Sequence, residues 1–211
     1  MFSKSQRKKI VFLSPHVDDA VIACGGTLAL LCEQSHEVYH ICFSFSEKSI
    51  PDGYSEDVTK KELLRASKVL GISSKNLIFH EYETRCFDMF RQNILEDLYK
   101  FNKEFNPDVV FLPSTYDLHQ DHAVISMEGI RAFKYKTIFG YEMPLNNMKF
   151  SADGFITLDQ QHVDKRQNAW RCFDSQIGKR SMNYTEPLAR VRGEQAGGEY
   201  AEAFEVIRLV L

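Results

Sequence analysis

Hydrophobic and polar positions along this chain fall into two kinds of segment that alternate with each other. Short apolar runs rich in β-branched residues are typical of buried strands, and longer stretches with apolar residues every three or four positions are typical of amphipathic helices. Strands are expected over residues 9–14, 37–45, 76–82, 108–113, 137–141, 155–158 and 204–210. Helices are expected over residues 25–34, 55–70, 87–105, 121–133, 159–173 and 186–194.

This order of strands and helices predicts the fold class. A β-α-β-α order favours an α/β protein, here a Rossmann-like three-layer α/β/α sandwich with a mostly parallel sheet and right-handed crossovers. The run from Val109 to Leu112 is apolar on both faces, as a central parallel strand should be. A chain of 211 residues is long enough for one well-buried core, so we expect a single domain over residues 1–211.

Composition narrows the class of protein and of partner. A hydrophobic content of 44% and a charged content of 26% are ordinary for a soluble globular protein. The net charge of −3 argues against nonspecific binding to nucleic acid, and no stretch approaches the ~20 apolar residues of a membrane span. The five cysteines are odd in number and never form a Cys-x-x-Cys pair, which argues against a disulfide framework and favours the reducing cytoplasm.

Potential metal-binding side chains gather in two short motifs, each directly after an expected strand. The first motif runs from Ser14 to Ala20 and reads Ser-Pro-His-Val-Asp-Asp-Ala, and the second runs from Asp117 to His122 and reads Asp-Leu-His-Gln-Asp-His. Open α/β sheets place their active sites at the carboxyl ends of the strands, so we expect the two motifs to share one site. Two imidazoles, one carboxylate and an open position suit a hydrolytic divalent metal, most simply zinc.

The spacing within the first motif separates its two carboxylates. His16 and Asp19 lie three residues apart at a strand-to-helix turn, where one helical turn brings both side chains to the same side. Asp18 lies between them and points in another direction, so it is not needed as a ligand. A carboxylate beside a metal-bound water is well placed to accept its proton. The alternative is that Asp18 and Asp19 only form an acidic pair that complements the helix dipole.

The second motif repeats this spacing with two imidazoles. His119 and His122 are three residues apart at an expected helix start, and Asp121 is a natural N-cap whose carboxylate is also suited to orient an imidazole. If His122 completes the metal set, His119 is left free to act as an imidazolium facing the developing oxyanion. Asp121 as a plain helix cap is the alternative. We favour a shared site because both motifs stand at strand ends of one expected sheet.

Other chemically active residues have no comparable setting. The remaining histidines are interpreted as structural; they are His36, His40, His80 and His162. The pair Gly25-Gly26 lacks the Gly-x-Gly-x-x-Gly spacing of a dinucleotide site, and no acidic residue closes the second expected strand in the required place. These glycines are instead expected to let the chain turn closely past the metal site and to start the helix.

Taken together, the two motifs make the chain similar to the LmbE-like, or PIG-L, zinc-dependent de-N-acetylases. Members of this family carry His-Pro-Asp-Asp-Glu followed shortly by Gly-Gly-Thr, and then His-x-Asp-His. This chain resembles both motifs, with Val17 in place of the proline and Ala20 in place of the glutamate. Weaker similarities extend over nearly the whole chain; they are Glu62, Ala66, Leu70-Gly71, Tyr141-Glu142 and the segment 193–204.

The resemblance implies a role for each polar residue of the two motifs. The ligands that it implies for one zinc ion per chain, or iron in its place, are His16, Asp19 and His122. It further implies that Asp18 is the general base and that His119, oriented by Asp121, is the acid and the oxyanion stabiliser. Ala20 removes a carboxylate beside the site but none of the implied ligands.

The resemblance also bears on the substrate. Family members typically remove acetyl from an N-acetylglucosamine unit carried on inositol, a nucleotide, a glycopeptide or a small saccharide. Many relatives have a substrate-holding arginine three residues before the position of Glu62, where this chain has Thr59. Arg85, just past the third expected strand, is the candidate that takes over substrate binding.

The expected function is that of a cytoplasmic metal-dependent hydrolase that removes an N-acetyl or other N-acyl group from an amino sugar or its conjugate. Its partner is then this small molecule, with no nucleic acid. Two alternatives stay open, namely a metal-dependent hydrolase of another amide or an ester, and a metal- or sugar-binding module without turnover. Asp18 and His119 argue against the second, because binding alone requires neither a base nor an acid.

Overall fold

The computed structural model describes residues 6–179 and 181–210, and within these ranges seven strands form one mixed sheet. The strands are β1 (Lys9–Ser14), β2 (Glu37–Cys42), β3 (Leu77–Phe79), β4 (Val109–Pro113), β5 (Thr137–Tyr141), β6 (Gly154–Leu158) and β7 (Tyr200–Arg208). Their order across the sheet is β3-β2-β1-β4-β5-β7-β6. Strands β1 to β5 run parallel to one another, whereas β7 is antiparallel to both β5 and β6. The expected mostly parallel sheet is confirmed.

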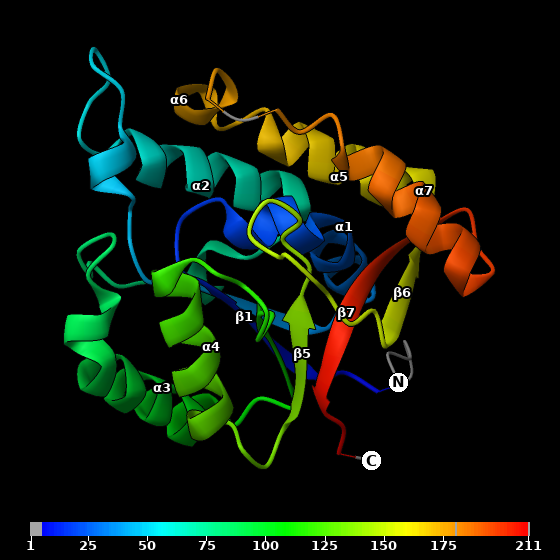
Figure 1. Ribbon diagram of the computed structural model, residues 1–211, viewed down its shortest axis with the longest axis horizontal. Coiled ribbons are helices and arrows are strands. Elements are labelled where there is room, and N and C mark those ends of the chain that lie inside the picture. The colour runs from blue at the N-terminus through cyan, green and yellow to red at the C-terminus, as the bar shows by residue number, and fades with distance from the viewer. Residues whose placement is uncertain (1–5, 180, 211) are drawn as a thin grey trace.

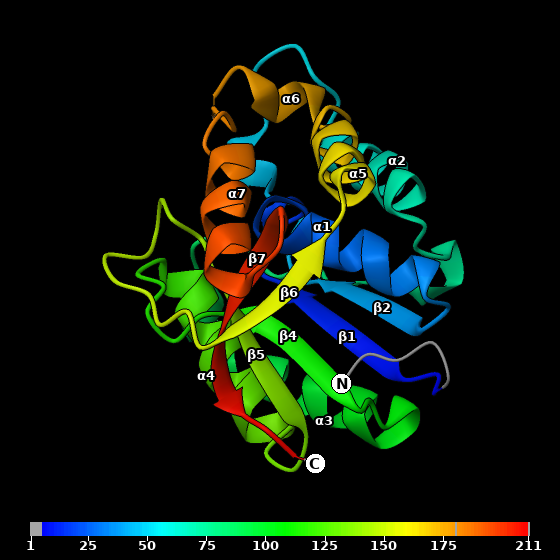
Figure 2. The same cartoon turned by 90° about the vertical axis from the view of Figure 1, so that its right-hand side faces the viewer.

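Helices cover both faces of this sheet. They are α1 (Asp19–Glu33), α2 (Val58–Leu70), α3 (Arg91–Phe105), α4 (Gln120–Ala132), α5 (Gln160–Trp170), α6 (Asp174–Ile177) and α7 (Thr185–Ala196), with short 3₁₀ segments η1 (Glu47–Ser49), η2 (Ser74–Asn76) and η3 (Phe87–Phe90). Helices α1, α2, α5 and α7 lie on one face, and α3 and α4 on the other (Figure 1 and Figure 2). The three-layer sandwich is therefore confirmed. Among the described residues, no helix combines the length and apolar character needed to span a membrane.

Side chains that alternate between the two faces bury the centre of the sheet. Phe12 on β1 and Phe111 on β4 belong to the apolar cluster on the α1 side, and their rings stack with centroids 4.5 Å apart. Val11 and Val110 belong to the cluster on the other face, beneath α3 and α4. All four side chains are fully buried. Two close-packed apolar layers thus hold β1 and β4 side by side and fix the start of each motif.

Parallel pairing brings the two motifs to one edge of the sheet. Phe12 lies opposite Phe111 in the register of β1 and β4, so the two strands end beside each other. The chain passes from β1 to α1 through residues 15–18, and from β4 to α4 through residues 114–119. Because both connections are short, the histidines and aspartates that they carry remain above the ends of these two strands.

Helix α1 differs from the expectation. It begins at Asp19 rather than at residue 25, and it is kinked at Cys24, whose φ of −146° and ψ of 33° are not helical. The backbone amides of Gly26 and Thr27, just past this kink, donate to the carboxylate of Glu202 at 3.0 and 2.7 Å. A residue of β7 therefore caps the second half of α1, and no local signal in the sequence of α1 indicates this.

The glycine pair at the kink serves close packing. A Cβ atom on Gly26 would lie 2.6 Å from a methyl carbon of Leu158, and one on Gly25 would lie 2.9 Å from Cγ of Arg166. Ordinary Cβ atoms do not approach other atoms so closely, so glycine is what lets α1 lie against α5 and β6 at this point. The expectation that these residues start the helix was wrong, because they lie within it.

Other boundaries also shift. The expected strand 76–82 shortens to β3, and the expected helix 87–105 divides into η3 and α3. Strand β7 begins at Tyr200 instead of residue 204, although the Tyr-Ala-Glu-Ala sequence at its start has little strand preference. Glu202 in this stretch is 4% exposed and pairs with Arg166 at 3.0 Å, so a tertiary contact overrides the local preference.

Candidate metal centre and catalytic cavity

Three side chains of the two motifs converge above the ends of β1 and β4. His16 lies in the turn after β1, Asp19 in the first turn of α1, and His122 in the first turn of α4. Asp19 Oδ2 lies 3.2 Å from His16 Nδ1 and 3.2 Å from His122 Nε2, and the three potential ligand atoms all lie within 4.8 Å of one another. All three residues are buried. We call His16, Asp19 and His122 the metal triangle.

The metal triangle has the chemistry and the dimensions of a small divalent-metal site. Tetrahedral ligands bound at ~2.1 Å are about 3.4 Å apart. The two 3.2 Å separations from Asp19 are close to this value. Two imidazole nitrogens and one carboxylate oxygen are ligands that zinc accepts, and three protein ligands leave a fourth position open for water or substrate. The residues present therefore fit such an ion.

Each histidine of the metal triangle is held from behind by a carboxylate. His16 Nε2 lies 2.9 Å from Asp121 Oδ2, and His122 Nδ1 lies 2.7 Å from Asp117 Oδ2. We call the ring nitrogen that faces away from the metal triangle the outer nitrogen, and the one that faces Asp19 the inner nitrogen. A carboxylate beside the outer nitrogen keeps it protonated, which leaves the inner nitrogen free to bind a metal. Asp117 was missed as a site residue from the sequence. Its place two residues before His119, directly after a strand, is the signal that could have indicated it.

The carboxylates make this corner favourable for positive charge. Burial by itself would lower the pKa of His122, but Asp19 and Asp117 raise it to about 10. Burial opposes the shift of His16 as well, and its pKa is nevertheless raised by Asp19 and Asp121. Burial would raise the pKa of Asp19, yet the two imidazoles hold it well below its usual range. A cation among these groups is therefore favoured by charge as well as by geometry.

Asp18 has surroundings different from those of Asp19. It occupies the N-cap position of α1, is buried, and lines the same cavity as the metal triangle without belonging to it. The turn that carries it is fixed from below, because Ser14 Oγ accepts the amide of Ala20 at 3.1 Å and lies 2.8 Å from His40 Nε2. His40 is buried beneath this turn, in agreement with the structural interpretation of this histidine.

His119 is the N-cap of α4, and the backbone orients its ring. Its Nδ1 accepts the amide of Asp121 at 3.2 Å, which leaves the neutral ring with its proton on Nε2. Burial, reinforced by the nearby His122 and His16, lowers the pKa of His119 to about 4. This lowered pKa favours the neutral ring near pH 7 over the expected imidazolium. Its Nε2–H is left to donate a hydrogen bond.

The Asp121 carboxylate contacts an imidazole, as expected, but it is that of His16 and not that of His119. Asp121 is the second residue of α4 rather than its N-cap, and its carboxylate contacts His16. The same carboxylate accepts the amides of Arg85 at 2.7 Å and of Phe87 at 3.3 Å, from the segment after β3. Asp121 orients His119 only through its own backbone amide. Contacts between separate α/β units of this kind cannot be read from spacing within one motif.

A cavity of about 280 Å³ opens above the metal triangle. The motifs form its floor, and its walls come from the loops after β2, β3 and β5 and from the region of α6 and the start of α7. Several wall residues carry uncharged polar side chains; they are Ser46, Ser49, Thr84, Asn146 and Gln176. His119 and Asp18 share this cavity with the metal triangle, so the described structure brings the candidate metal ligands, base and donor to one place.

Arg85 also lines the cavity, with an exposed side chain. Its φ of 70° lies in the left-handed region that residues other than glycine seldom adopt, and the hydrogen bond from its amide to Asp121 holds it there. Thr59, the residue compared above with the family's arginine, is not among the residues that line the cavity. It is buried, and its hydroxyl donates to the carbonyl of Phe45 at 2.6 Å.

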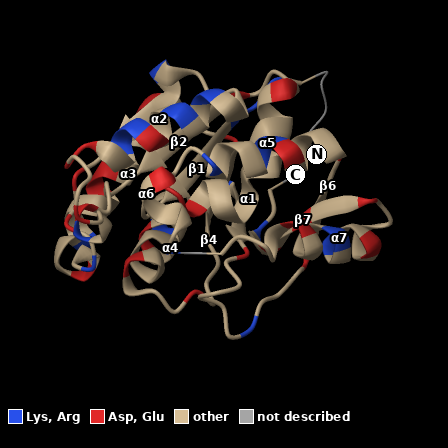
Figure 3. Cartoon of the chain, turned by 90° about the horizontal axis from the view of Figure 1, so that it is seen from above, with Lys and Arg blue, Asp and Glu red and all other residues tan. Residues whose placement is uncertain are grey.

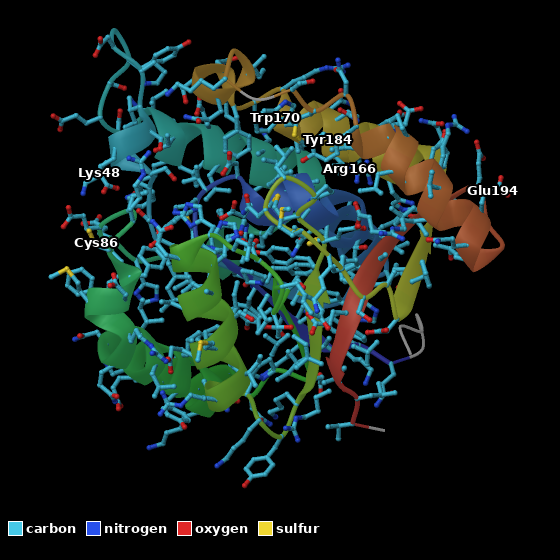
Figure 4. All side chains as sticks on the ribbon, in the orientation of Figure 1. Lys48, Cys86, Arg166, Trp170, Tyr184 and Glu194 are labelled. Atoms are coloured by element: carbon cyan, nitrogen blue, oxygen red, sulfur yellow. The ribbon has the colours of Figure 1, made fainter. Side chains whose placement is uncertain are left out.

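The two loops that flank Arg85 are tied together. The carboxylate of Glu47, after β2, accepts the amide and the hydroxyl of Thr84, after β3, both at 3.1 Å. Farther out, Lys48 forms an ion pair with Glu83, and its Nζ lies 4.0 Å from Cys86 Sγ (Figure 4). This side of the cavity is therefore a connected wall rather than two independent loops.

Comparisons with known proteins agree with the geometry. Residues 11–133 match the model of the PIG-L family, which is described as GlcNAc-PI de-N-acetylase. The chain is 21% identical to diacetylchitobiose deacetylase of Thermococcus kodakarensis over 229 residues, which cover 95% of this chain and 83% of that protein. Both motifs lie within the range that the family model matches.

Solved structures show the same fold. N,N'-diacetylchitobiose deacetylase from Pyrococcus horikoshii superposes with a TM-score of 0.79 at 20% identity, covering 96% of this chain and 85% of that chain. GalB, the 4-carboxy-2-hydroxymuconate hydratase from Pseudomonas putida KT2440, superposes with a TM-score of 0.76 at 20% identity, covering 97% and 98%. Since one of these proteins is a hydratase, the fold alone does not fix the reaction. The matched range and both motifs do fix the family, and the chain belongs to the PIG-L family.

Proposed function

We propose that this protein is a metal-dependent hydrolase that removes an N-acetyl group from an amino sugar or one of its conjugates. The observation that carries the proposal is the metal triangle, with a separate carboxylate, Asp18, and an N–H donor, His119, in the same cavity. Membership of a family described as GlcNAc-PI de-N-acetylase supports it, as does the similarity to a diacetylchitobiose deacetylase.

We assign one metal ion to His16, Asp19 and His122 and propose zinc as its identity. When bound, zinc would polarise the amide carbonyl and lower the pKa of a coordinated water to ~7. Asp121 and Asp117 keep the outer nitrogens of the two imidazoles protonated, so both rings offer an inner lone pair. Iron(II) accepts the same ligands, and elemental analysis of protein purified without chelator distinguishes the two metals.

Asp18 is the base in this proposal. It lies beside the metal ligand Asp19 and lines the cavity, where an ionised carboxylate can accept a proton from the attacking water. An amine leaves slowly unless it is protonated, and the proton taken by Asp18 is available for it as the C–N bond breaks. This assigns the acid step to Asp18, because burial lowers the pKa of His119 to about 4 and so favours its neutral form near pH 7.

His119 stabilises the developing oxyanion as a neutral donor. The amide of Asp121 occupies Nδ1, so the ring presents Nε2–H, and a fixed donor of this kind stabilises negative charge on the former carbonyl oxygen. Asp121 contributes without touching the substrate, through its amide to His119 and through its carboxylate to His16. Arg85 is the proposed substrate-binding side chain on the wall of the cavity.

Release of free amine from a panel of N-acetylated amino sugars and their conjugates tests the function. With metal-loaded protein we expect equal amounts of amine and acetate from at least one of them, and almost none with Asp18→Asn. The panel also includes an O-acetyl ester and an N-acetyl amino acid. Hydrolysis of only these two compounds, or calorimetric binding of the sugars without any hydrolysis, would overturn the proposal in favour of another bond or of a binding module.

A further inference from the structure

A second surface lies directly beside the catalytic cavity. It is formed by the loop after β4, residues 114–119, and by the segment between β5 and β6, residues 142–153, which projects from the body of the molecule (Figure 2). The two are bound together, because the amide of Leu118 donates to the carbonyl of Asn146 at 3.3 Å and the Asn146 side chain donates to Asp117 at 3.2 Å. Asp117 and Asn147 also pair as an isolated β-bridge.

This surface exposes large apolar side chains to solvent. Leu118 is 69% exposed, Leu145 66% and Met148 86%. Tyr116 is partly buried beside them, and Tyr116, Leu118 and Met148 line a hollow of about 340 Å³. Single exposed apolar residues are common, but several of them gathered around a hollow mark a binding surface. We call Tyr116, Leu118, Leu145 and Met148 the apolar rim.

The apolar rim is continuous with the catalytic cavity. Leu145 and its neighbour Asn146 line the cavity itself, and Leu118 directly precedes His119 in the chain. Asp117, to which Asn146 donates, is also the carboxylate behind the metal-triangle residue His122. A molecule that occupies the cavity and extends beyond it on this side therefore reaches the apolar rim first.

The size and polarity of the cavity indicate which part of a substrate it holds. Its volume of about 280 Å³ lies just below the ~300–1,000 Å³ that ligand sites usually measure. Such a space suits a single sugar ring with its N-acetyl group, and the hydroxyl and amide side chains of the wall suit the sugar's hydroxyls. A group attached to that sugar must lie outside, and on the side of Leu145 the neighbouring surface carries exposed apolar side chains.

We propose that the apolar rim binds an apolar group attached to the amino sugar, such as an alkyl, acyl or aryl aglycone. The preferred substrate is then an amphiphilic N-acetyl amino-sugar conjugate rather than a free sugar. This rests on the proposed function, because the sugar must occupy the cavity for its attached group to reach Leu118, Leu145 and Met148. These side chains offer apolar contact without directional hydrogen bonds, so the rim selects for apolar area.

Methyl and hexyl glycosides of N-acetylglucosamine test this proposal, because they share the sugar and differ only in apolar area. With the metal-loaded full chain we expect kcat/KM about tenfold higher for the hexyl glycoside, mainly through KM. Met148→Ser and Leu118→Ser should each remove most of this preference and leave the methyl glycoside within about twofold of wild type. Met127→Ser, at an exposed methionine of α4 outside the rim, is the matched control and should keep the preference.

The outcomes separate the two proposals. Equal kcat/KM for both glycosides, or a preference for the hexyl glycoside that survives in both rim variants, would overturn the proposal that the apolar rim binds an apolar group. The proposed deacetylase function would be unaffected. If no N-acetylated sugar is hydrolysed, the proposed function fails. Calorimetry then tests the apolar rim separately, by comparing the affinities of Asp18→Asn for the two glycosides. Equal affinities would overturn the proposal that the rim binds the hexyl group. Sedimentation with phosphatidylcholine vesicles that is lost in Met148→Ser would assign the rim to a bilayer instead and overturn it as well. Circular dichroism verifies that each variant is folded.

Discussion

Asp18 and Asp19 are chemically identical neighbours whose surroundings suit them to different tasks. Asp19 lies 3.2 Å from each of the two imidazoles of the metal triangle, and these hold its pKa well below the usual range. Asp18 stands at the N-cap of α1, beside the cavity and outside the triangle. One carboxylate is thus placed to hold a cation and the other to exchange a proton, as in other sites where two acids act differently.

Asp18→Asn separates these tasks. We expect this variant to keep the metal content of the wild type, because no ligand changes, and to lose turnover by roughly 10²–10⁴-fold, because an amide cannot accept the proton. Asp19→Asn should lose metal as well as turnover. Elemental analysis and amine release measure the two effects. Turnover near the wild-type value in metal-loaded Asp18→Asn would remove Asp18 from the role of base.

Asp117 gives a second prediction at this scale. Its carboxylate lies 2.7 Å from the outer nitrogen of His122, so Asp117→Asn should weaken metal binding by roughly 10–100-fold. Competition with a chelator measures the dissociation constant. Asp164→Asn makes the same chemical change on the exposed side of α5 and serves as control. Equal affinities of the two variants would show that the carboxylate behind His122 does not support the metal.

At the scale of elements, α1 is supported from a distance. Its first turn carries Asp19, and its second half is capped by Glu202 of β7 through the amides of Gly26 and Thr27. Glu202 also pairs with Arg166 of α5, both only 4% exposed. The helix that begins at the metal triangle is therefore fixed in place by the two elements that pack against its far half.

Removing one partner of this pair should be costly. Glu202→Ala leaves the Arg166 guanidinium buried without its carboxylate and leaves two amides of α1 uncapped, so we expect a loss of about 3–5 kcal/mol in the free energy of unfolding. The double variant Arg166→Met with Glu202→Leu removes both charges and should lose less. Urea unfolding compares them. A double variant less stable than Glu202→Ala would contradict this account.

At the scale of the whole molecule, the sequence predicts the layers and the edge that carries the site. The ends of β1 and β5 agree with the expected ranges because compact apolar runs define these strands without outside help. The start of α1 was missed because its support, Glu202, lies 176 residues from Gly26 along the chain. Spacing predicts that His16 and Asp19 lie together, and the family resemblance adds His122. Neither predicts the bond from Asp121 to His16, which joins separate units.

Charges of both signs are mixed on the surface of the molecule. Lysine and arginine are interspersed with aspartate and glutamate over the helices seen in Figure 3, and the net charge is −3. Binding to nucleic acid usually requires basic residues gathered on one face or along one helix. Neither the balance of charges nor their distribution in this view has that character.

Acid should destabilise the whole molecule through His40. Burial lowers its pKa to about 4, whereas the unfolded chain has the ordinary value of ~6.5. Between these pH values the imidazole of His40 binds a proton in the unfolded chain but not in the folded one. The contribution of neutral, buried His40 to the free energy of unfolding is therefore complete above pH ~6.5 and is lost as pH falls toward 4. The total is about 3 kcal/mol. Urea unfolding of metal-free protein across this range should show a shallower fall for His40→Gln, and parallel curves for both proteins would contradict the assignment.

The first turn of α4 holds together three parts of the proposed chemistry. His119 caps the turn, Asp121 secures the ring of His16, and His122 belongs to the metal triangle. Fraying of this one turn would therefore remove the metal ligand His122, the donor His119 and the carboxylate that orients His16 in a single step. We expect no partly active intermediate state. The amide of Ala123, which donates to the carbonyl of His119 at 2.9 Å, reports on the same event. Its hydrogen-exchange rate should rise with the fraction of molecules in which this turn is open and which are therefore inactive.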